Sequence, residues 1–189
     1  MPPTGLVPPI PGSWVRWDAP ITALPADPAY AAALQKSRDR TGLDESVVTG
    51  EGRMRGRRVA VVACEFAFLA GSIGAQAADR LVAAVERATD ERLPLLASPT
   101  AGVARMQEGT LAFLQMVKIT AAIGRHKAAG NPCPVYLPNP TTGGVLASWG
   151  HHTVAEPGAL IGFLGRRVYR APPLHCPARN DHAGVIIGR

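Results

Sequence analysis

Two short glycine-containing segments have residue types and spacing that would present backbone N–H groups to a ligand. The first, TAGVARMQEG (residues 100–109), follows the apolar, strand-like LPLLAS and leads into a strongly helix-forming run. The second, NPTTGGVLAS (residues 139–148), repeats this order of strand, glycine turn and helix start. The first N–H groups of a helix have no partner within the helix, and the helix dipole favours negative charge there. The two turns therefore predict two sets of N–H groups aimed at a ligand.

Further candidate binding residues are glycines and arginines. Gly71 and Gly74 in EFAFLAGSIG, and Gly143 and Gly144 in the second turn, are interpreted either as points of close ligand approach or as sites of close helix–strand packing, with equal weight. One cluster of arginines falls at the turn of an expected hairpin, and we favour a water-exposed hairpin tip over a phosphate site there: Arg53, Arg55, Arg57 and Arg58.

The cysteines and histidines do not predict a metal site. Cys64, Cys133 and Cys176 form no C-x-x-C pair, which fits neither a disulfide framework nor a four-cysteine zinc site. His151 and His152 are adjacent, so on a strand they would point to opposite faces. The sequence predicts reduced thiols and no metal in this chain.

Composition sets the class of protein. With 189 residues, 47% of them hydrophobic, the chain is long enough for one core-bearing domain. A membrane span needs about 20 apolar residues, and the sequence has no such run. It also shows no leader peptide, so we expect a cytoplasmic protein. The net charge of +6 favours polyanions or phosphorylated ligands. Because the basic residues are dispersed and no nucleic-acid motif is found, a phosphate-bearing small molecule explains the charge equally well.

The expected elements divide the chain into an arm and an α/β body. Residues 1–45 are predicted to be a proline-rich, irregular arm held by Trp14 and Trp17, and the body begins at Ser46. We expect a hairpin over 46–64, strands at 95–98 and 133–137, and two helices. The first helix has Ser72 as N-cap and the buried stripe Ile73, Ala77, Leu81, Val85 and Ala88. The second spans 104–129, with the stripe Met106, Phe113, Val117 and Ala121.

The order of four motifs resembles that of a known family. EFAFLAGSIG, ARMQEG, NPTTGGVLAS and AEPGALIGFLGRRV, spread over 46–168, are similar to the β-type carboxyltransferase subunit of biotin-dependent acyl-CoA carboxylases. The resemblance implies a crotonase-like (ClpP/crotonase) superhelix of ββα units. It also implies transfer of a carboxyl group from carboxybiotin, carried on a biotin carboxyl carrier protein, to an acyl-CoA, with acetyl-CoA to malonyl-CoA in fatty acid biosynthesis as the favoured instance.

The resemblance also implies site residues. The backbone N–H groups of Gly102 and Val103 would form the oxyanion hole that stabilises a thioester enolate. Val103 stands where the family has a second glycine, and its β-branched side chain resists a positive φ. Arg105 and Arg166 would contact substrate, although a structural or solvated role is weighed for each. Glu108 is interpreted as complementing the dipole of the helix that it begins.

The sequence also leads to expectations about binding partners, and it leaves other functions open. The resemblance implies an α-type carboxyltransferase subunit and a biotin carboxylase as partners, an oligomer, and neither nucleic acid nor membrane as a partner. The tail, residues 169–189, lacks helical periodicity, so the family domain is expected to be truncated there. Three alternatives stay open: a non-catalytic binding or assembly module, another crotonase-type CoA enzyme such as a hydratase, and a basic nucleic-acid-binding protein.

Overall fold

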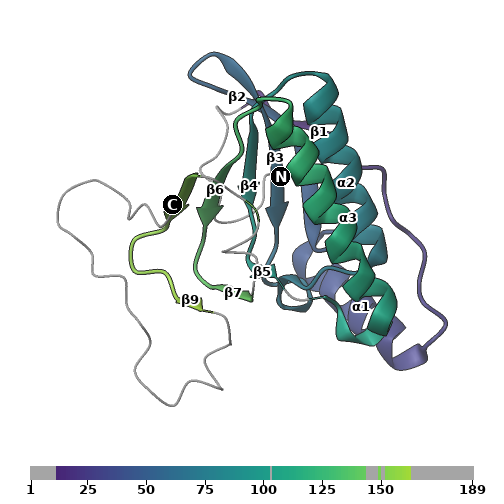
Figure 1. Cartoon of the computed structure of the whole chain (residues 1–189). Coiled ribbons are helices and arrows are strands. Elements are labelled where there is room, and N and C mark those ends of the chain that lie inside the picture. The colour runs from purple at the N-terminus through teal and green to yellow at the C-terminus, as the bar shows by residue number, and fades with distance from the viewer. Residues whose placement is uncertain (1–11, 103, 144–148, 150–151, 163–189) are drawn as a thin grey trace.

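The computed structural model describes residues 12–102, 104–143, 149 and 152–162. Within them the chain forms two sheets, with helices packed along one side (Figure 1). The larger sheet has six strands in the order β1 (Val15–Arg16), β2 (Val47–Met54), β3 (Arg57–Cys64), β4 (Leu95–Ser98), β6 (Pro134–Leu137) and β8 (His152–Ala155). The smaller sheet has three, in the order β5 (Ala101–Gly102), β7 (Thr141–Gly143) and β9 (Ile161–Gly162).

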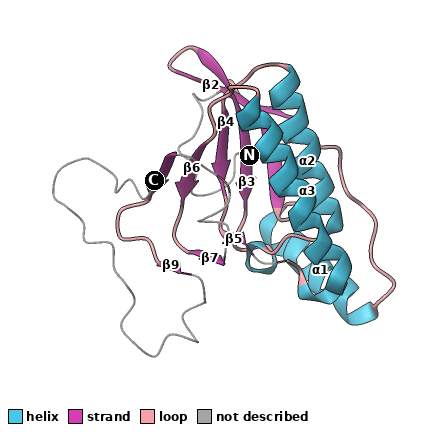
Figure 2. Cartoon of the chain, in the orientation of Figure 1, coloured by secondary structure: helices cyan, strands magenta, loops and turns pink. Residues whose placement is uncertain are grey.

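The chain winds repeatedly between these two sheets. Each of β4, β6 and β8 lies in the larger sheet and is followed in sequence by a strand of the smaller one, β5, β7 or β9. Pairing from β3 onward is parallel in both sheets. A repeated strand–strand–helix winding of this kind is the superhelix that the family resemblance implies, and Figure 2 shows the helices gathered on one side of it.

The hairpin and the two short strands are confirmed. β2 and β3 pair antiparallel from Val47 opposite Cys64 to Met54 opposite Arg57. β4 has the predicted limits, and β6 begins at Pro134. Proline has no N–H to donate to a neighbouring strand, and it is tolerated at the first position of a strand, where the hydrogen-bond ladder begins.

Within the helix α2 (Ala75–Asp90) the predicted stripe is confirmed for Ala77, Leu81, Val85 and Ala88, which are at most 1% exposed, whereas the fifth member, Ile73, is buried but lies before the helix begins. Its N-cap is a correction. Gly74, and not Ser72, is the cap residue, and the Ser72 hydroxyl donates to the Leu69 carbonyl. The helix start is instead satisfied from elsewhere in the chain, as described below.

The stripe predicted for the second helix is wrong. This helix, α3 (Gly109–Ala128), follows a 3₁₀ turn at Met106–Glu108, and Met106, Phe113 and Val117 are 85%, 67% and 67% exposed. Its buried face is the opposite one: Ala112, Gln115, Ile119, Ala122, Ile123 and His126. Because the helix is apolar on both faces, periodicity alone does not say which face meets the core.

The segment predicted to be an irregular arm contains a helix, α1 (Pro28–Thr41). Asp27 caps it by accepting from the Tyr30 N–H at 2.6 Å, and Pro28 occupies the first turn, where its missing N–H costs nothing. Because prolines are frequent before residue 28, the segment was predicted to be irregular and this helix start was missed. None of the described helices combines the length and the apolar character that a membrane span needs.

The predicted anchoring by tryptophans is confirmed. Trp14 packs with the small cluster of Val61 and Ala63, and Trp17 packs against the main core, with the Arg87 guanidinium 4.3 Å from its ring centroid. Arg80, 8% exposed, ties the same segment down by donating to the Asp44 carboxylate at 2.6 Å and the Ala19 carbonyl at 2.8 Å.

Candidate functional site

The two glycine turns found in the sequence lie side by side. In the parallel pairing of β5 with β7, Ala101 is opposite Thr142 and Gly102 is opposite Gly143. The Thr142 N–H donates to the Thr100 carbonyl at 3.1 Å, which holds the two segments in register. Gly143 has a φ of +85°, a conformation that favours glycine. Val103, Gly144 and Arg166 lie outside the described residues.

The loop before α2 joins this pair of turns. Ile73 forms a parallel bridge with Ala104, and the Arg105 N–H donates to the Ile73 carbonyl at 2.9 Å. The structure therefore brings together three parts of the chain that are far apart in the sequence: residues 71–74, residues 101–102 with 104–105, and residues 141–143. The sequence predicted each segment separately, but not that they are adjacent.

The Arg105 side chain is a buried structural element. It is 1% exposed, and its guanidinium donates to the Glu45 carboxylate at 2.8 Å, the Ser72 carbonyl at 2.8 Å and the Tyr30 hydroxyl at 3.1 Å. Burial opposes its charge, but the hydrogen bonds and negative charge of Glu45 outweigh burial and raise the pKa of Arg105 above its usual range. The geometry does not support the predicted substrate contact, because the cation is committed inside the protein.

Glu108 reaches a different helix from the one predicted. Its carboxylate accepts from the Ala75 N–H at 2.6 Å, so it satisfies the N-terminus of α2 and not that of its own helix. The Tyr30 hydroxyl donates to the other carboxylate oxygen. Burial and this hydrogen bond to Glu108 raise the pKa of Tyr30 to about 12.

This carboxylate explains one of the predicted glycines. A Cβ at Gly74 would lie 2.2 Å from the Glu108 Oε1 atom, so the glycine makes room for the cap. For Gly74 the structure favours close internal packing over ligand approach. Gly71, at a φ of +70°, ends the 3₁₀ turn Leu69–Gly71 and donates its N–H to the Phe68 carbonyl at 2.8 Å.

Sequence reasoning missed Tyr30 and Glu45, whose side chains accept hydrogen bonds from the Arg105 guanidinium. Both fell in the segment assigned to the irregular arm. The Asp27–Pro28 pair, a helix start signal, was available for Tyr30. No local signal marks Glu45, since its importance comes from Arg105, 60 residues later in the chain.

Two charged side chains next to the site, Arg105 and Glu108, make their contacts inside the protein, where they link residues 104–108 to the loop at 71–74 and to the start of α2. A glycine turn held in this way can stabilise a negative charge that develops on a ligand oxygen, because its donors need no rearrangement.

Comparisons with known proteins agree with this arrangement. The family model described as the carboxyl transferase domain matches residues 23–172. The chain is 68% identical over 161 residues to a probable biotin-dependent acyl-coenzyme A carboxylase beta3 subunit of Mycobacterium bovis, covering 84% of this chain and 32% of that protein. It is 43% identical over 166 residues to an acetyl-coenzyme A carboxylase carboxyl transferase subunit beta of Roseiflexus castenholzii, covering 83% of this chain and 56% of that protein.

Solved structures support the fold. A transcarboxylase 12S structure superposes with a TM-score of 0.67 at 24% identity, covering 85% of this chain and 30% of that one. A Pseudomonas malonate decarboxylase heterodimer gives 0.60 at 22% identity, covering 84% and 62%. The chain spans between about a third and just over half of the length of the two curated relatives named above. The family match over most of the chain and the shared winding of strands show that the chain belongs to the carboxyl transferase domain family.

Proposed function

We propose that this chain is the acyl-CoA-binding half of a biotin-dependent carboxyltransferase, with acetyl-CoA as substrate and malonyl-CoA, for fatty acid biosynthesis, as product. The observation that carries the proposal is the placement of Gly102 directly opposite Gly143, beside the loop at 71–74. Family membership supports the reaction class. The names of relatives support both a general acyl-CoA and acetyl-CoA specifically.

The proposed role of the chain is to stabilise an enolate. Loss of the α-proton from an acyl thioester places negative charge on the carbonyl oxygen, and the backbone N–H groups of Gly102 and Val103 would donate hydrogen bonds to that oxygen. Carboxybiotin on its carrier protein supplies the carboxyl group. The chain's own contribution is to hold the N–H groups still, through the bonds of Arg105 to Ser72 and Glu45.

The net charge of the chain supports a CoA ligand. A charge of +6 attracts the phosphates of CoA, and the proposed substrate-binding groups are Gly71, Gly143, Gly144 and Arg166. We place the function in the cytoplasm, because the described cysteines Cys64 and Cys133 are free and buried thiols.

The proposal includes partners. The relatives are named as subunits of carboxylases, and this chain spans between a third and just over half of their length. We therefore propose that an α-type carboxyltransferase subunit completes the site, and that a biotin carboxyl carrier protein and a biotin carboxylase supply carboxybiotin.

A second candidate function is a non-catalytic module with the same fold. Val103 favours it, because a β-branched residue stands at the position where the proposed oxyanion turn would use a glycine. The two candidates differ in one respect: only the catalytic one requires that a complete complex containing this chain carboxylates acetyl-CoA.

Calorimetric titration of the purified full chain with acetyl-CoA tests the proposal, with dephospho-CoA as the control ligand. We expect saturable binding that weakens without the 3′-phosphate. Gly102→Val should abolish it, whereas Glu51→Gln on the β2–β3 hairpin, outside the proposed site, should not change it. No binding by a folded chain would overturn the acyl-CoA site. Binding without carboxyl transfer in a reconstituted complex, unrescued by Val103→Gly, would favour the non-catalytic module.

A further inference from the structure

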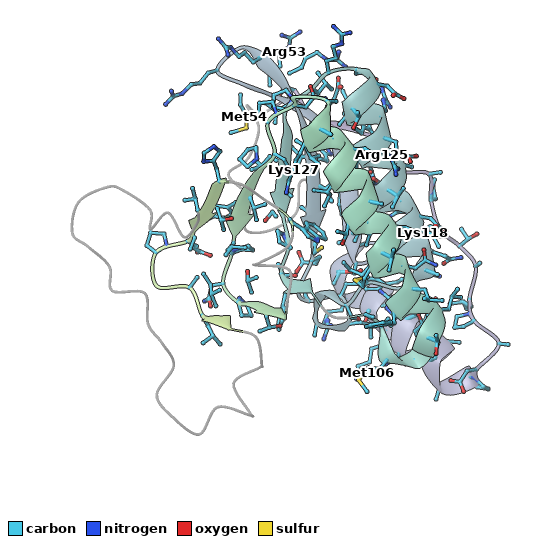
Figure 3. The ribbon with its side chains drawn as sticks, in the orientation of Figure 1. Arg53, Met54, Met106, Lys118, Arg125 and Lys127 are labelled. Atoms are coloured by element: carbon cyan, nitrogen blue, oxygen red, sulfur yellow. The ribbon has the colours of Figure 1, made fainter. Side chains whose placement is uncertain are left out.

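Arginines gather at the end of the molecule that is remote from the glycine turns. β3 starts at the hairpin turn and runs parallel to β4, whose carboxyl end leads into the first glycine turn. β3 has eight residues, and at about 3.3 Å per residue its two ends are roughly 25 Å apart. Figure 3 shows Arg53, on the hairpin, at one end of the molecule and Met106, which follows Arg105, at the other.

The hairpin turn carries an arginine at a position that favours other residues. Met54 is paired with Arg57, so Arg55 and Gly56 form a two-residue loop, and their φ angles are +50° and +79°. A loop of this kind needs a positive φ at both positions, and its first position is usually asparagine, aspartate or glycine. Arg55 therefore holds a backbone conformation that costs an arginine more than it would cost those residues.

The end of α2 carries a second arginine of this kind. Arg92 follows the helix with a φ of +52°. Its N–H donates to the Thr89 carbonyl at 3.1 Å, and the Leu93 N–H donates to the Ala88 carbonyl at 2.9 Å. These two bonds define the Schellman ending of a helix, in which the left-handed residue is usually glycine and sometimes asparagine. An arginine thus again stands where the backbone favours a smaller residue.

The two turns belong to one positively charged surface. The Arg58 guanidinium donates at 2.6 Å to the carboxylates of both Glu51, on β2, and Glu91, at the end of α2, so the turns are neighbours. Residues 51–58 and 87–92 together hold six arginines against three acidic residues. Three exposed arginines beside this pairing form no ion pair within the described part of the chain, and we name them the arginine surface: Arg53, Arg55 and Arg92.

We infer that the arginine surface binds an acidic segment of a partner protein. Guanidinium groups donate paired hydrogen bonds to carboxylates, so three free guanidinium groups at one end of the molecule suit a short run of glutamates or aspartates. The backbone supports a role in binding, because Arg55 and Arg92 occupy left-handed positions that the fold by itself would fill with smaller residues. The inference is independent of the proposed function, because it does not require that acyl-CoA binds.

The composition of the two segments favours a protein over other anionic partners. Residues 51–58 and 87–92 contain no aromatic residue on which the bases of a single-stranded nucleic acid would stack. Duplex DNA is bound through a longer series of phosphate contacts than three cations provide. Binding to a lipid surface uses large apolar side chains beside the cations, and Met54 is the only one in these segments.

Fluorescence anisotropy of a labelled octaglutamate peptide, titrated with the full chain at low salt, tests the inference. We expect saturable binding that weakens as salt is added, because exposed ion pairs are screened. The double variant Arg55→Asn/Arg92→Asn should raise the Kd for the peptide by about threefold or more, since two exposed ion pairs are lost. Its melting temperature should be equal to or higher than that of the unmodified chain, because asparagine accepts the left-handed conformation.

The matched control Lys36→Asn/Lys118→Asn removes the same charge from exposed positions of α1 and α3 and should change the Kd much less. Equal weakening by the two double variants would overturn the inference, because net charge alone would then explain the binding. A lower melting temperature of the arginine variant would also overturn it, since the two arginines would then serve the fold. So would the absence of peptide binding, or tighter binding to short duplex DNA or to phosphatidylserine vesicles than to the peptide.

Discussion

Glu45→Gln is the substitution that tests the internal support of the site most directly. Glu45 and Arg105 have side chains 2% and 1% exposed and are joined by two hydrogen bonds. Removing one partner of such a pair leaves a buried charge uncompensated, which costs roughly 3–5 kcal/mol. Glutamine keeps one acceptor for the guanidinium, so we expect a loss of about 3 kcal/mol in the free energy of unfolding.

Urea unfolding, followed by tryptophan fluorescence and circular dichroism, measures this loss. For a chain of this length, about 3 kcal/mol corresponds to a fall of roughly 6–12 °C in melting temperature. The matched control is Glu51→Gln. Glu51 pairs with Arg58, whose side chain is 42% exposed, and an ion pair open to water contributes little to stability.

The double variant Glu45→Gln/Arg105→Met refines the test. When both partners are removed, no buried charge remains, so the double variant should be less destabilised than the sum of the two single variants. The reasoning would be refuted if Glu45→Gln cost no more than Glu51→Gln. It would also be refuted if the two single effects at 45 and 105 simply added, because the pair would then not be coupled.

Three further predictions follow from perturbed titrating groups. Burial would raise the pKa of Asp44, but hydrogen bonds from Arg80 and Ile21 outweigh burial and lower it to about 2. The stabilisation of the folded state by the ionised Asp44 is therefore complete above about pH 4 and is lost as the pH falls toward 2. Asp44→Asn should lower the free energy of unfolding by about 1 kcal/mol at pH 7, with solvent screening included, and by much less near pH 2. A pH-independent difference in urea stability would contradict this. Burial raises the pKa of Cys64 to about 12 and also raises that of Cys133, so neither thiol of a Cys176→Ser variant should react with a disulfide reagent before unfolding, and rapid native labelling would disprove it. Burial lowers the pKa of His126, which holds it neutral beside the Thr89 hydroxyl, so stability should fall as the pH drops below about 6.5 and His126→Leu should remove that dependence. An unchanged pH profile in this variant would assign the dependence to another group.

The sequence predicted correctly those elements for which the spacing of apolar residues and the flanking residues mark the same limits. The stripe of α2 and the limits of β4 followed from apolar spacing and the flanking prolines, because both depend on neighbouring residues only. The helix α1 was missed although Asp27 and Pro28 mark its start, because the surrounding prolines suggested an irregular arm.

The site was predicted only in part. The sequence identified Gly102 and Gly143 through their turns, but it did not show that they are direct neighbours across β5 and β7. Arg105 was recognised as a candidate with either a substrate-binding or a structural role, but its partners Glu45 and Tyr30 could not be predicted, because they approach it through tertiary folding.

By itself, the sequence determined the family-like order of motifs, the glycine turns and the segments able to become strands and helices. Each of these depends on short-range backbone preferences and on side-chain periodicity. Only the tertiary structure decided which face of α3 is buried, which carboxylate caps α2 and which groups neutralise Arg105. Those outcomes depend on contacts between residues 30 to 80 positions apart, and no local preference specifies such contacts.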